Sequence, residues 1–305
     1  MRVIVTGASG FIGKPLITGL ANRGSTLYGL SRHPPEPSKN VVPLHGDVTQ
    51  PGLGLKEIPE NIDALYHLAA IHKLGDDKNG NLWATNVTGT RNVIQFCEDH
   101  NIPHLFFCST AYTQGRNPYE KSKAKCEWMV SQSLGIPEVT TFKPSIVMGT
   151  KDNPYLGHVS QFISLLIKTH KRAELIRRKV EGTLRLPILE PVFRLKGDPE
   201  GRLNLIAIDD VVKAMIEIEK PGTFWLTNPH PPTLGQLVSW IGEEIFVRLE
   251  ILPHVKYTPL EVTFHKLAKP FDPYLLGDNF RSDIKKVIPI DREFIRDVVL
   301  NTLNP

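Results

Sequence analysis

The sequence predicts an α/β protein in which a parallel β-sheet carries helices on both faces. A short apolar stretch at residues 2–6 opens the chain and runs directly into a glycine-rich turn and a helix pattern. Strand-like and helix-like segments then alternate five times within the first 110 residues. The chain has 305 residues and is 41% hydrophobic, which suffices for one large or two modest domains with a sizeable core.

The turn at residues 7–13 joins the first strand to the first helix. Gly7 permits a tight turn, Gly10 has no side chain to keep a phosphate from the backbone, and Gly13 lets the helix approach the strand closely. Unpaired N–H groups and the positive end of the helix dipole then face an anion. The turn therefore predicts a site for the pyrophosphate of a dinucleotide. Its place directly after a strand argues against a turn that needs glycine for its shape alone.

Further strand candidates lie at residues 27–32, 41–48, 64–70 and 104–110. The segment 64–70 is apolar nearly throughout, as is typical of a parallel strand covered on both faces. A helix is expected from about residue 83 to about residue 97. This order predicts a doubly wound parallel sheet of the Rossmann type.

The end of the second strand is where such a fold reads the adenosine ribose, and an acidic residue there selects NAD. This chain has Ser31, Arg32 and His33 instead. Because an Arg can pair with a 2′-phosphate, we favour NADP(H) as the cofactor over a solvated surface Arg. Asp47, at the end of the third strand, either accepts a hydrogen bond from the adenine amino group or caps a turn.

The fourth strand candidate contains one polar side chain, His67, which we interpret as a hydrogen-bonded core residue rather than a base. Ala69 and Ala70 follow it. Because their side chains are small, a cofactor could lie against the backbone at this point.

The start of a helix that carries two candidate catalytic residues follows the fifth strand. Asn117 is expected as the N-cap, Pro118 at the first helical position and Glu120 at the third. Tyr119 and Lys123 are four residues apart and therefore share a helix face. A nearby Lys ammonium favours the phenolate and lowers the pKa of a Tyr from its usual value of about 10, which suits proton transfer near neutral pH.

Thr110, at the end of the neighbouring strand, could polarise a substrate oxygen. A Tyr and a Lys at this spacing also occur on ordinary amphipathic helices. The position of Tyr119 and Lys123, just after the fifth strand, favours chemistry, because the carboxyl edge of an α/β sheet holds its ligands.

These motifs together resemble the extended branch of the short-chain dehydrogenase/reductase family. The matching residues are Thr6-Gly7-x-x-Gly10-x-x-Gly13, His67-Leu68-Ala69-Ala70, Asn86-Val87-x-Gly89-Thr90, Ser109-Thr110-Ala111 and Tyr119-x-x-x-Lys123. Within that branch, the segments most similar to the thioester reductase and fatty acyl reductase group are residues 109–115, 119–123, 143–149, 206–212 and 226–234.

The resemblance implies that Tyr119 is the proton donor, that Lys123 binds the nicotinamide ribose and tunes Tyr119, and that Thr110 holds the substrate oxygen. Including Arg32 and Asp47, the expected cofactor-binding residues are Gly7, Ser9, Gly10, Phe11, Ile12, Gly13, Arg32, Asp47, Val48, Leu68, Ala69, Ala70, Asn86, Lys123, Pro144, Ser145 and Ile146. No metal site is expected. Only eight residues separate Thr110 from Tyr119, fewer than the family leads us to expect, and this points to a more open site.

Two domains are expected. Residues 1–150 and 201–228 would form the NADP-binding domain, and residues 151–200 and 229–305 a smaller, irregular, mostly helical substrate-binding lobe. Together they would form a pocket between domains.

Within the lobe, residues 159–167 have an apolar helix face, and residues 168–196 contain nine Lys or Arg against three Glu. This basic run could receive the phosphates of coenzyme A or the acidic face of a carrier protein, or it is a solvated helix and loop. A strand with a helix at residues 203–219 and a strand at residues 222–227 return to the pattern of the sheet.

Composition excludes several other classes. A net charge of +4 is too small to argue for nucleic acid, and no apolar run reaches the roughly 20 residues that span a bilayer. The first strand begins at residue 2, which is not the pattern of a signal peptide. Cys97, Cys108 and Cys126 have no disulfide or zinc spacing, so we expect free thiols in the cytoplasm. The sequence leaves a homodimer open.

The favoured function is an NADPH-dependent reductase of an acyl thioester, carried on coenzyme A or a carrier protein, or of the aldehyde derived from it. One alternative keeps the fold and changes the substrate, as in a sugar-nucleotide epimerase or dehydratase, or a reductase of a free ketone. Another alternative is a non-catalytic NADP-sensing protein. The presence of Thr110, Tyr119 and Lys123 argues against a sensor, which does not need them.

Overall fold

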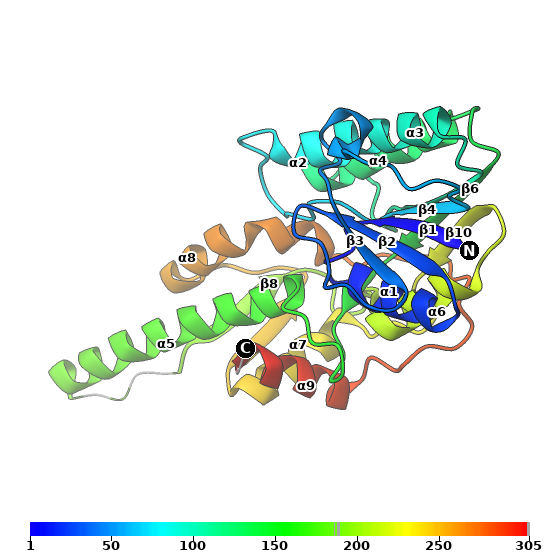
Figure 1. Cartoon of the computed structure of the whole chain (residues 1–305). Helices are drawn as coiled ribbons and strands as arrows, with labels where there is room; N and C mark the ends of the chain where they lie inside the picture. Colours follow the sequence, from blue (N-terminus) through cyan, green and yellow to red (C-terminus); the bar gives the residue numbers. More distant parts are fainter. Residues whose placement is uncertain (186, 188–189, 304–305) are drawn as a thin grey trace. The chain divides into compact units, whose positions relative to one another are not determined.

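The computed structural model describes residues 1–185, 187 and 190–303 (Figure 1). The chain divides into two compact units. Unit 1 comprises Met1–Ser145, Ile208–Thr227 and Arg281–Lys285, and unit 2 comprises the described residues of Ile146–Ala207, Asn228–Phe280 and Lys286–Pro305. The short segment 281–285, which the sequence assigns to the lobe, belongs to unit 1 because Asp283 exchanges two hydrogen bonds with the backbone of Trp225.

Unit 1 is built on a seven-stranded sheet in the order β10-β6-β5-β4-β1-β2-β3, and every adjacent pair is parallel. The strands are β1 (Arg2–Thr6), β2 (Thr26–Ser31), β3 (Val41–His45), β4 (Ala64–His67), β5 (His104–Cys108), β6 (Glu138–Pro144) and β10 (Gly222–Leu226). The chain proceeds outward from β1 to β3 and then restarts beside β1 at β4. This reversal confirms the predicted doubly wound class and places a topological switch point between β1 and β4.

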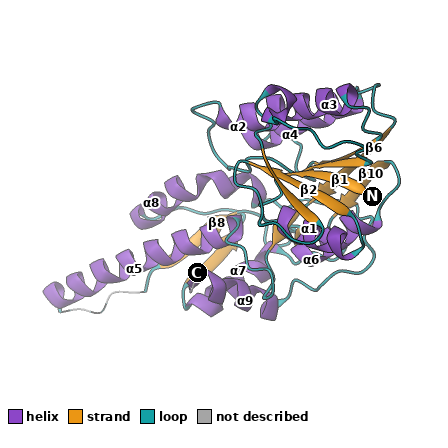
Figure 2. Cartoon of the chain, viewed as in Figure 1, coloured by secondary structure: helices purple, strands orange, loops and turns teal. Residues whose placement is uncertain are grey.

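Helices cover both faces of this sheet (Figure 2). Those of unit 1 are α1 (Gly13–Asn22), η1 (Pro51–Gly54), α2 (Asn81–Trp83), η2 (Ala84–Thr88), α3 (Gly89–Asp99), α4 (Pro118–Ser131) and α6 (Ile208–Glu217). α1 packs beside α6 on one face, and α2, η2, α3 and α4 pack together on the other. The apolar core between the second group and the sheet includes Leu65, Phe96, Leu105 and Phe107, all fully or almost fully buried.

Several expected elements have different limits. Four of the five strands expected within the first 110 residues end one to three residues early, because the residues that follow them use their polar groups in loops. The N–H groups of Leu68 and Ala69, for example, bond to the side-chain hydroxyl of Thr6, and that of Leu68 also reaches the carbonyl of Thr6. The single helix expected from about residue 83 is a short α-turn, a π-turn (η2) and then α3. The sequence did not single out β6 as a strand.

Unit 2 contains helices, as expected, and also two small parallel two-stranded sheets that were not expected. Its elements are β7 (Ile146–Met148), α5 (His158–Leu184), β8 (Val192–Lys196), β9 (Leu205–Ala207), α7 (Leu234–Ile245), β11 (Arg248–Leu252), α8 (Pro259–Ala268), η3 (Lys269–Tyr274) and α9 (Arg292–Leu303). The expected strand near residue 203 is β9, and it pairs with β7 rather than with the main sheet.

The core of unit 2 is mostly aliphatic and contains a cluster of aromatic rings. Phe264 lies edge-on to Phe193 and Phe162, with ring centroids 5.3 and 6.0 Å apart. α7 and α9 add aliphatic side chains to this cluster. The fully buried carboxylate of Glu261 pairs with the partly buried Arg194, and their nearest charged atoms are 2.6 Å apart.

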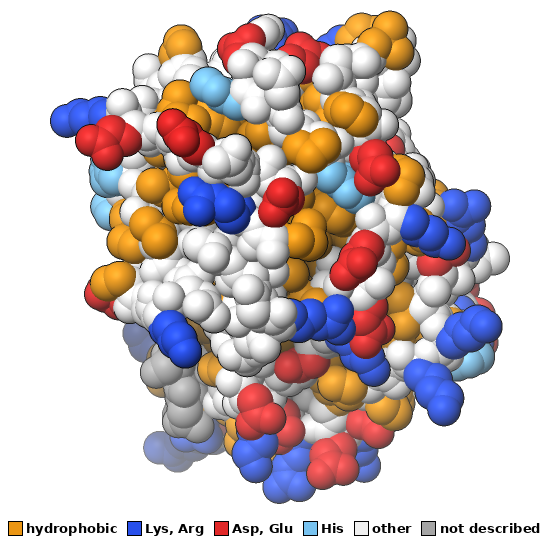
Figure 3. All heavy atoms as spheres, turned by 45° about the vertical axis from the view of Figure 1, so that its right-hand side comes forward, with side chains coloured by type: hydrophobic (Ala, Val, Ile, Leu, Met, Phe, Trp, Pro, Cys, Tyr) orange, Lys and Arg blue, Asp and Glu red, His pale blue; other side chains and the backbone are white. Residues whose placement is uncertain are grey.

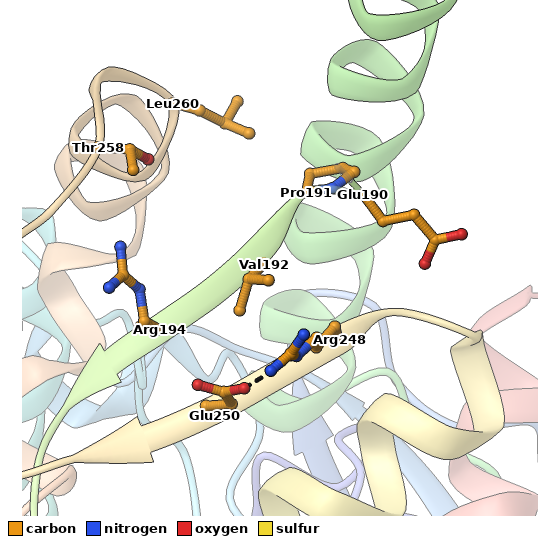
Figure 4. A pocket seen from close by; sticks show the side chains of 8 residues that line it. All are labelled: Glu190, Pro191, Val192, Arg194, Arg248, Glu250, Thr258 and Leu260. Carbon is orange, nitrogen blue, oxygen red and sulfur yellow. Dashed lines mark hydrogen bonds and ion pairs between the residues drawn. The ribbon is translucent and has the colours of Figure 1, made fainter. Parts of the chain in front are cut away.

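An open pocket of about 350 Å³ lies beside β8 and β11 of unit 2 (Figure 4). It is lined by Glu190, Pro191, Val192, Arg194, Arg248, Glu250, Thr258 and Leu260. Both of its cations are already neutralised, Arg194 by Glu261 and Arg248 by Glu250. The pocket therefore offers no unpaired cation among its described lining residues, and Glu190 adds a carboxylate to the lining.

Candidate active site

The glycine turn has the close packing that its sequence predicts. Gly7 has a φ of +70°, and a Cβ atom on it would lie 2.8 Å from the backbone nitrogen of Ala69. A Cβ on Gly13 would lie 2.2 Å from the carbonyl oxygen of Gly7. Since the obstacles are backbone atoms, neither position accepts a side chain without a shift of the turn. Gly10 is similarly close, at 3.0 Å from the same oxygen.

The end of β2 adjoins this turn. The hydroxyl of Ser9 donates to the hydroxyl of Ser31 at 3.0 Å, which in turn donates to the carbonyl of His33 at 2.6 Å. Arg32 is exposed. The turn and the segment that carries Arg32 are therefore linked by direct hydrogen bonds, and no acidic residue stands at positions 31–33.

Asp47 has a local partner. One carboxylate oxygen accepts hydrogen bonds from the backbone N–H and the hydroxyl of Thr49, at 2.9 and 2.8 Å. These bonds cap the turn between β3 and η1, so the turn interpretation of Asp47 is correct. The adenine contact stays a prediction.

A chain of neutral hydrogen bonds crosses the switch point between β1 and β4. The hydroxyl of Thr6 accepts from the N–H groups of Leu68 and Ala69, so its own proton goes to Nδ1 of His67 at 2.8 Å. Nε2 of His67 then donates to the hydroxyl of Thr90 at 3.1 Å. Burial, aided by the ammonium of Lys123, lowers the pKa of His67 to about 3. His67 is therefore the hydrogen-bonded core histidine that the sequence indicates.

Asn86 ties this region to α4. Its amide exchanges two hydrogen bonds with the backbone of Ile71, at 2.8 and 3.0 Å, and donates a third to Ser122 on α4 at 2.9 Å. The hydroxyl of Ser122 donates to the carbonyl of Tyr119 at 2.7 Å. Asn86 lies in the π-turn, and its carbonyl accepts from the backbone N–H of Gly89 and from the hydroxyl of Thr90, the latter at 2.6 Å. Asn86 thus links the segment after β4 to α4, through contacts that the sequence did not reveal.

The start of α4 is capped as expected. The side chain of Asn117 accepts from the N–H of Glu120 at 3.0 Å, and Pro118 occupies the first turn. The fully buried carboxylate of Glu120 accepts from both the backbone N–H and the side-chain Nε of Arg116 at 3.0 Å. Arg116, in the short loop that precedes Tyr119, is therefore attached to Glu120 in the first turn of α4.

Lys123 is buried one turn after Tyr119 on α4. Its Nζ donates to the carbonyl of Cys108, the last residue of β5, at 2.7 Å. Thr110 follows two residues later, where its hydroxyl accepts from the N–H of Tyr112 at 3.2 Å and donates to the carbonyl of Pro144 at 3.3 Å. The structure thus brings the face of α4 that carries Tyr119 and Lys123 to the carboxyl end of β5.

A second tether between α4 and the sheet was not predicted. Glu127, one turn beyond Lys123, accepts a hydrogen bond from Ser109 and pairs with the buried ammonium of Lys143 on β6. That ammonium also lies 4.8 Å from the ring centroid of Trp225. Glu127 follows Tyr119 by eight residues and Lys123 by four, so helical spacing was the signal that could have found it.

Ser145 ends unit 1 directly after Pro144. Its side chain is 5% exposed, and its hydroxyl has no hydrogen-bond partner in the part of the chain that the structure describes. A buried hydroxyl is normally paired, so this one is available to a bound group. Together with the close-packed glycine turn, it fits a dinucleotide whose nicotinamide end lies near residues 144 and 145.

The other expected cofactor residues lie around the same sheet edge or beside it. Leu68, Ala69 and Ala70 follow β4, while Phe11 and Ile12 precede α1. Val48 is buried against Gly89, where a Cβ would lie 2.8 Å from its side chain. Ile146 is the first residue of unit 2 and of its strand β7.

Two absences concern the described residues only. Within residues 1–185, 187 and 190–303, no group of His, Cys, Asp or Glu side chains is arranged to hold a metal ion. Over the same ranges, no helix is both long and apolar enough to cross a membrane. The three cysteines are buried free thiols, and burial raises the pKa of Cys97 to about 12.

The fold and the arrangement around α4 define an oxidoreductase of the extended short-chain dehydrogenase/reductase class. The model of the NAD dependent epimerase/dehydratase family matches residues 3–221. The chain belongs to this family.

Relatives of known name share much of the chain. A 2-alkyl-3-oxoalkanoate reductase from Stenotrophomonas maltophilia is 35% identical over 272 residues, which cover 78% of this chain and 74% of the relative. Sterol demethylase protein B from Methylococcus capsulatus is 24% identical over 80% of this chain and 74% of its own.

Solved structures agree on the fold. The terminal R domain from the myxalamid PKS-NRPS biosynthetic pathway superposes with a TM-score of 0.73 at 20% identity, covering 99% of this chain and 90% of the domain. A UDP-galactose 4-epimerase superposes with a TM-score of 0.63 at 18% identity, covering 100% of this chain and 99% of the enzyme.

Proposed function

We propose that this chain is an NADPH-dependent reductase of an acyl thioester or of the aldehyde derived from it. The observation that carries the proposal is the double attachment of α4, the helix that carries Tyr119, to the end of β5 through Lys123 with Cys108 and through Glu127 with Ser109. Such preorganisation is what a proton donor requires. The relative at 35% identity, a 2-alkyl-3-oxoalkanoate reductase, supports reduction of a carbonyl group as the reaction type.

When bound, the reduced nicotinamide supplies the hydride. Tyr119 would donate a proton to the oxygen of the carbonyl group as hydride reaches its carbon, which turns an aldehyde into an alcohol and a thioester into a hemithioacetal. The carbon–sulfur bond of the hemithioacetal then breaks, which releases the aldehyde and the free thiol. Lys123 has two N–H groups beyond the one that binds Cys108, and these would hold the ribose and keep a positive charge beside Tyr119. Thr110 would turn its proton from the carbonyl of Pro144, which it reaches at a long 3.3 Å, toward the substrate oxygen.

The first test is the removal of the Tyr119 hydroxyl. Tyr119→Phe should lower kcat by about 1,000-fold and leave the Kd for NADPH within about twofold, because a proton donor acts on the chemical step alone. Tyr28→Phe, the same change on β2, is the matched control and should keep kcat. A Tyr119→Phe variant with full turnover would exclude Tyr119 as the acid.

The choice of NADPH over NADH is supported by Arg32, which is exposed at the end of β2 without an acidic neighbour at positions 31 to 33. Arg32→Ala should raise KM for NADPH by roughly 10- to 100-fold, the value of a charge-assisted pair, and change KM for NADH little. Equal losses with both cofactors would contradict the assignment of the 2′-phosphate to Arg32.

A free ketone is the second candidate substrate, favoured by the relative at 35% identity, which is a 2-alkyl-3-oxoalkanoate reductase. NADPH consumption should be compared across acyl-coenzyme A thioesters, the matching aldehydes and 3-oxo acids of the same chain length. Activity on thioesters or aldehydes supports the first proposal, and activity on the 3-oxo acids alone supports the second.

We further propose that unit 2 binds the substrate.

The panel also separates the remaining alternatives. An epimerase recycles its cofactor, so product formation from a nucleotide sugar without net NADPH consumption would favour that reaction. A sensor would bind NADPH without turnover of any carbonyl compound. Net consumption of NADPH that depends on Tyr119 excludes both.

A further inference from the structure

One face of α5 in unit 2 carries charge of a single sign. Its exposed residues recur at the spacing of one helical face, and we call this set the basic face of α5. The set is Lys168, Lys171, Arg172, Leu175, Ile176, Arg178 and Lys179. Five of these seven side chains are cations, and none is an acid. The two apolar members lie between the cations, with Leu175 71% exposed and Ile176 55% exposed.

The acidic residues of the same stretch, Glu174 and Glu181, lie outside the basic face and flank it on the side of Arg177 and Arg178. Glu174 and Glu181 both pair with Arg177, each at 2.8 Å. Glu174 is also 4.0 Å from Arg178. Among the described residues, no acidic side chain pairs with the four lysine and arginine residues Lys168, Lys171, Arg172 and Lys179. By contrast, acidic and basic side chains alternate over the face of the molecule in Figure 3.

Packing against the core does not explain why α5 continues as a helix beyond Ala173. The buried residues of α5 are Ser160, Ile163, Leu166 and Ala173, and none follows Ala173. In Figure 1 the helix runs on well beyond β8. An isolated helical end in water is marginal, and a pair of exposed aliphatic side chains on it gains nothing from the core. A partner on the basic face would explain both features.

We propose that the basic face of α5 binds the surface of an anionic phospholipid bilayer. Cations on a helix face are attracted to anionic headgroups, and aliphatic side chains among them enter the headgroup boundary. The helix would lie on the bilayer and not cross it, in agreement with the absence of a spanning helix among the described residues. A bilayer suits this face better than an acidic protein, because the face is a convex helix side with an apolar centre and needs no matched groove.

The expected affinity for an anionic membrane follows from the number of cations on the basic face of α5. A Lys or Arg near an anionic membrane contributes about fivefold in affinity, and three of them roughly 100-fold. The dependence on salt should be strong, because the headgroup potential falls off within a Debye length. The apolar pair should contribute a part that salt does not remove.

The experiment is sedimentation of the full chain with vesicles of phosphatidylcholine alone or with added phosphatidylserine, at low and high salt. The unmodified chain should bind the anionic vesicles at low salt and should not bind phosphatidylcholine. The combined variant Lys171→Gln, Arg172→Gln, Lys179→Gln should bind roughly 100-fold more weakly. Lys39→Gln, Lys56→Gln, Lys78→Gln, at three exposed positions of unit 1, removes the same charge and should bind like the unmodified chain.

Leu175→Ser with Ile176→Ser should weaken binding to the anionic vesicles at low salt by roughly tenfold, and circular dichroism would check that α5 remains helical. The proposal fails if no anionic vesicle binds, if both charge variants lose binding equally, or if an acidic carrier protein binds this face and vesicles do not. Because carbonyl reduction is not the readout, these outcomes are independent of the proposed reductase function.

Discussion

The switch point of unit 1 and the contact between α8 and β8 of unit 2 satisfy their buried polar side chains in different ways. In unit 1 the buried groups around the switch point are mostly neutral and form one connected chain from Thr6 through His67 and Thr90 to Asn86. In unit 2 a buried charge, Glu261, is satisfied by one cation, Arg194. A connected neutral network spreads its bonds over four elements, whereas an ion pair depends on each partner. The hydrogen-bond chain thereby fixes several side chains of unit 1 relative to one another, whereas the ion pair joins α8 to β8 in unit 2.

The largest effect on stability and cofactor binding is expected in unit 1, at a glycine of the turn between β1 and α1. Gly13→Ala would place a Cβ 2.2 Å from the Gly7 carbonyl, so α1 must move away from β1. We expect a loss of stability of about 3 kcal/mol or more and at least a 100-fold weaker binding of NADPH. Thermal unfolding and a titration with NADPH measure the two effects. Native affinity in this variant would contradict a close-packed phosphate turn.

In unit 2 the largest effect should come from Glu261, which lies on α8 and accepts from Arg194 on β8 at 2.6 and 2.7 Å. Glu261→Ala leaves Arg194 without its partner and should cost about 3 kcal/mol of unfolding free energy. Glu293→Gln, at an exposed position of α9, is the control and should change the unfolding midpoint little. An equal effect of both substitutions would argue against the ion pair as the tie between α8 and β8.

Glu261 also predicts a dependence on pH. Burial opposes its ionisation, but hydrogen bonds from Arg194 and Thr258 outweigh burial and hold its pKa at about 2, below the ordinary 4.5. Its contribution to stability is therefore complete above pH 4.5 and is lost as the pH falls toward 2. The stability difference between the unmodified chain and Glu261→Gln should shrink over that interval. A difference that is constant from pH 6 to 2 would contradict the low pKa.

A smaller effect on stability and a selective one on catalysis is expected at Asn86. Asn86→Ala removes three hydrogen bonds, two to Ile71 and one to Ser122, at a cost of about 2 kcal/mol. Because Ser122 adjoins Tyr119, kcat should fall more than the affinity for NADPH. Asn92→Ala, which removes an amide bonded to the carbonyls of Val48 and Gln50, is the control and should leave kcat intact. Equal kcat values in the two variants would deny Asn86 a positioning role.

The smallest effect has the opposite sign. A Cβ on Gly182, near the end of α5, meets no atom within 4 Å, and the residue is helical. Gly182→Ala should stabilise the helix by about 1 kcal/mol, because alanine loses less backbone entropy than glycine. The helical signal in circular dichroism and its melting measure this change. Together with Gly13→Ala, the result shows whether a glycine is required by packing or only tolerated.

Prediction from sequence was most successful where function imposes a local pattern. The turn at residues 7–13, the cap of α4 at Asn117 and the order of the first five strands depend on neighbours in sequence, so spacing alone revealed them. The roles of Tyr119, Lys123 and Arg32 remain predictions that the proposed variants test. The sequence therefore determined the fold class, the family resemblance and the candidate site.

Tertiary structure decided what depends on distant partners. The contacts of Asn86 with Ser122, of Glu127 with Lys143, and of Glu261 with Arg194 span 16 to 67 residues. The small sheets of unit 2 likewise pair strands too short to show a periodic pattern. Hydrogen bonds and ion pairs act over a few ångströms in space, and the sequence contains no such distance until the chain has folded.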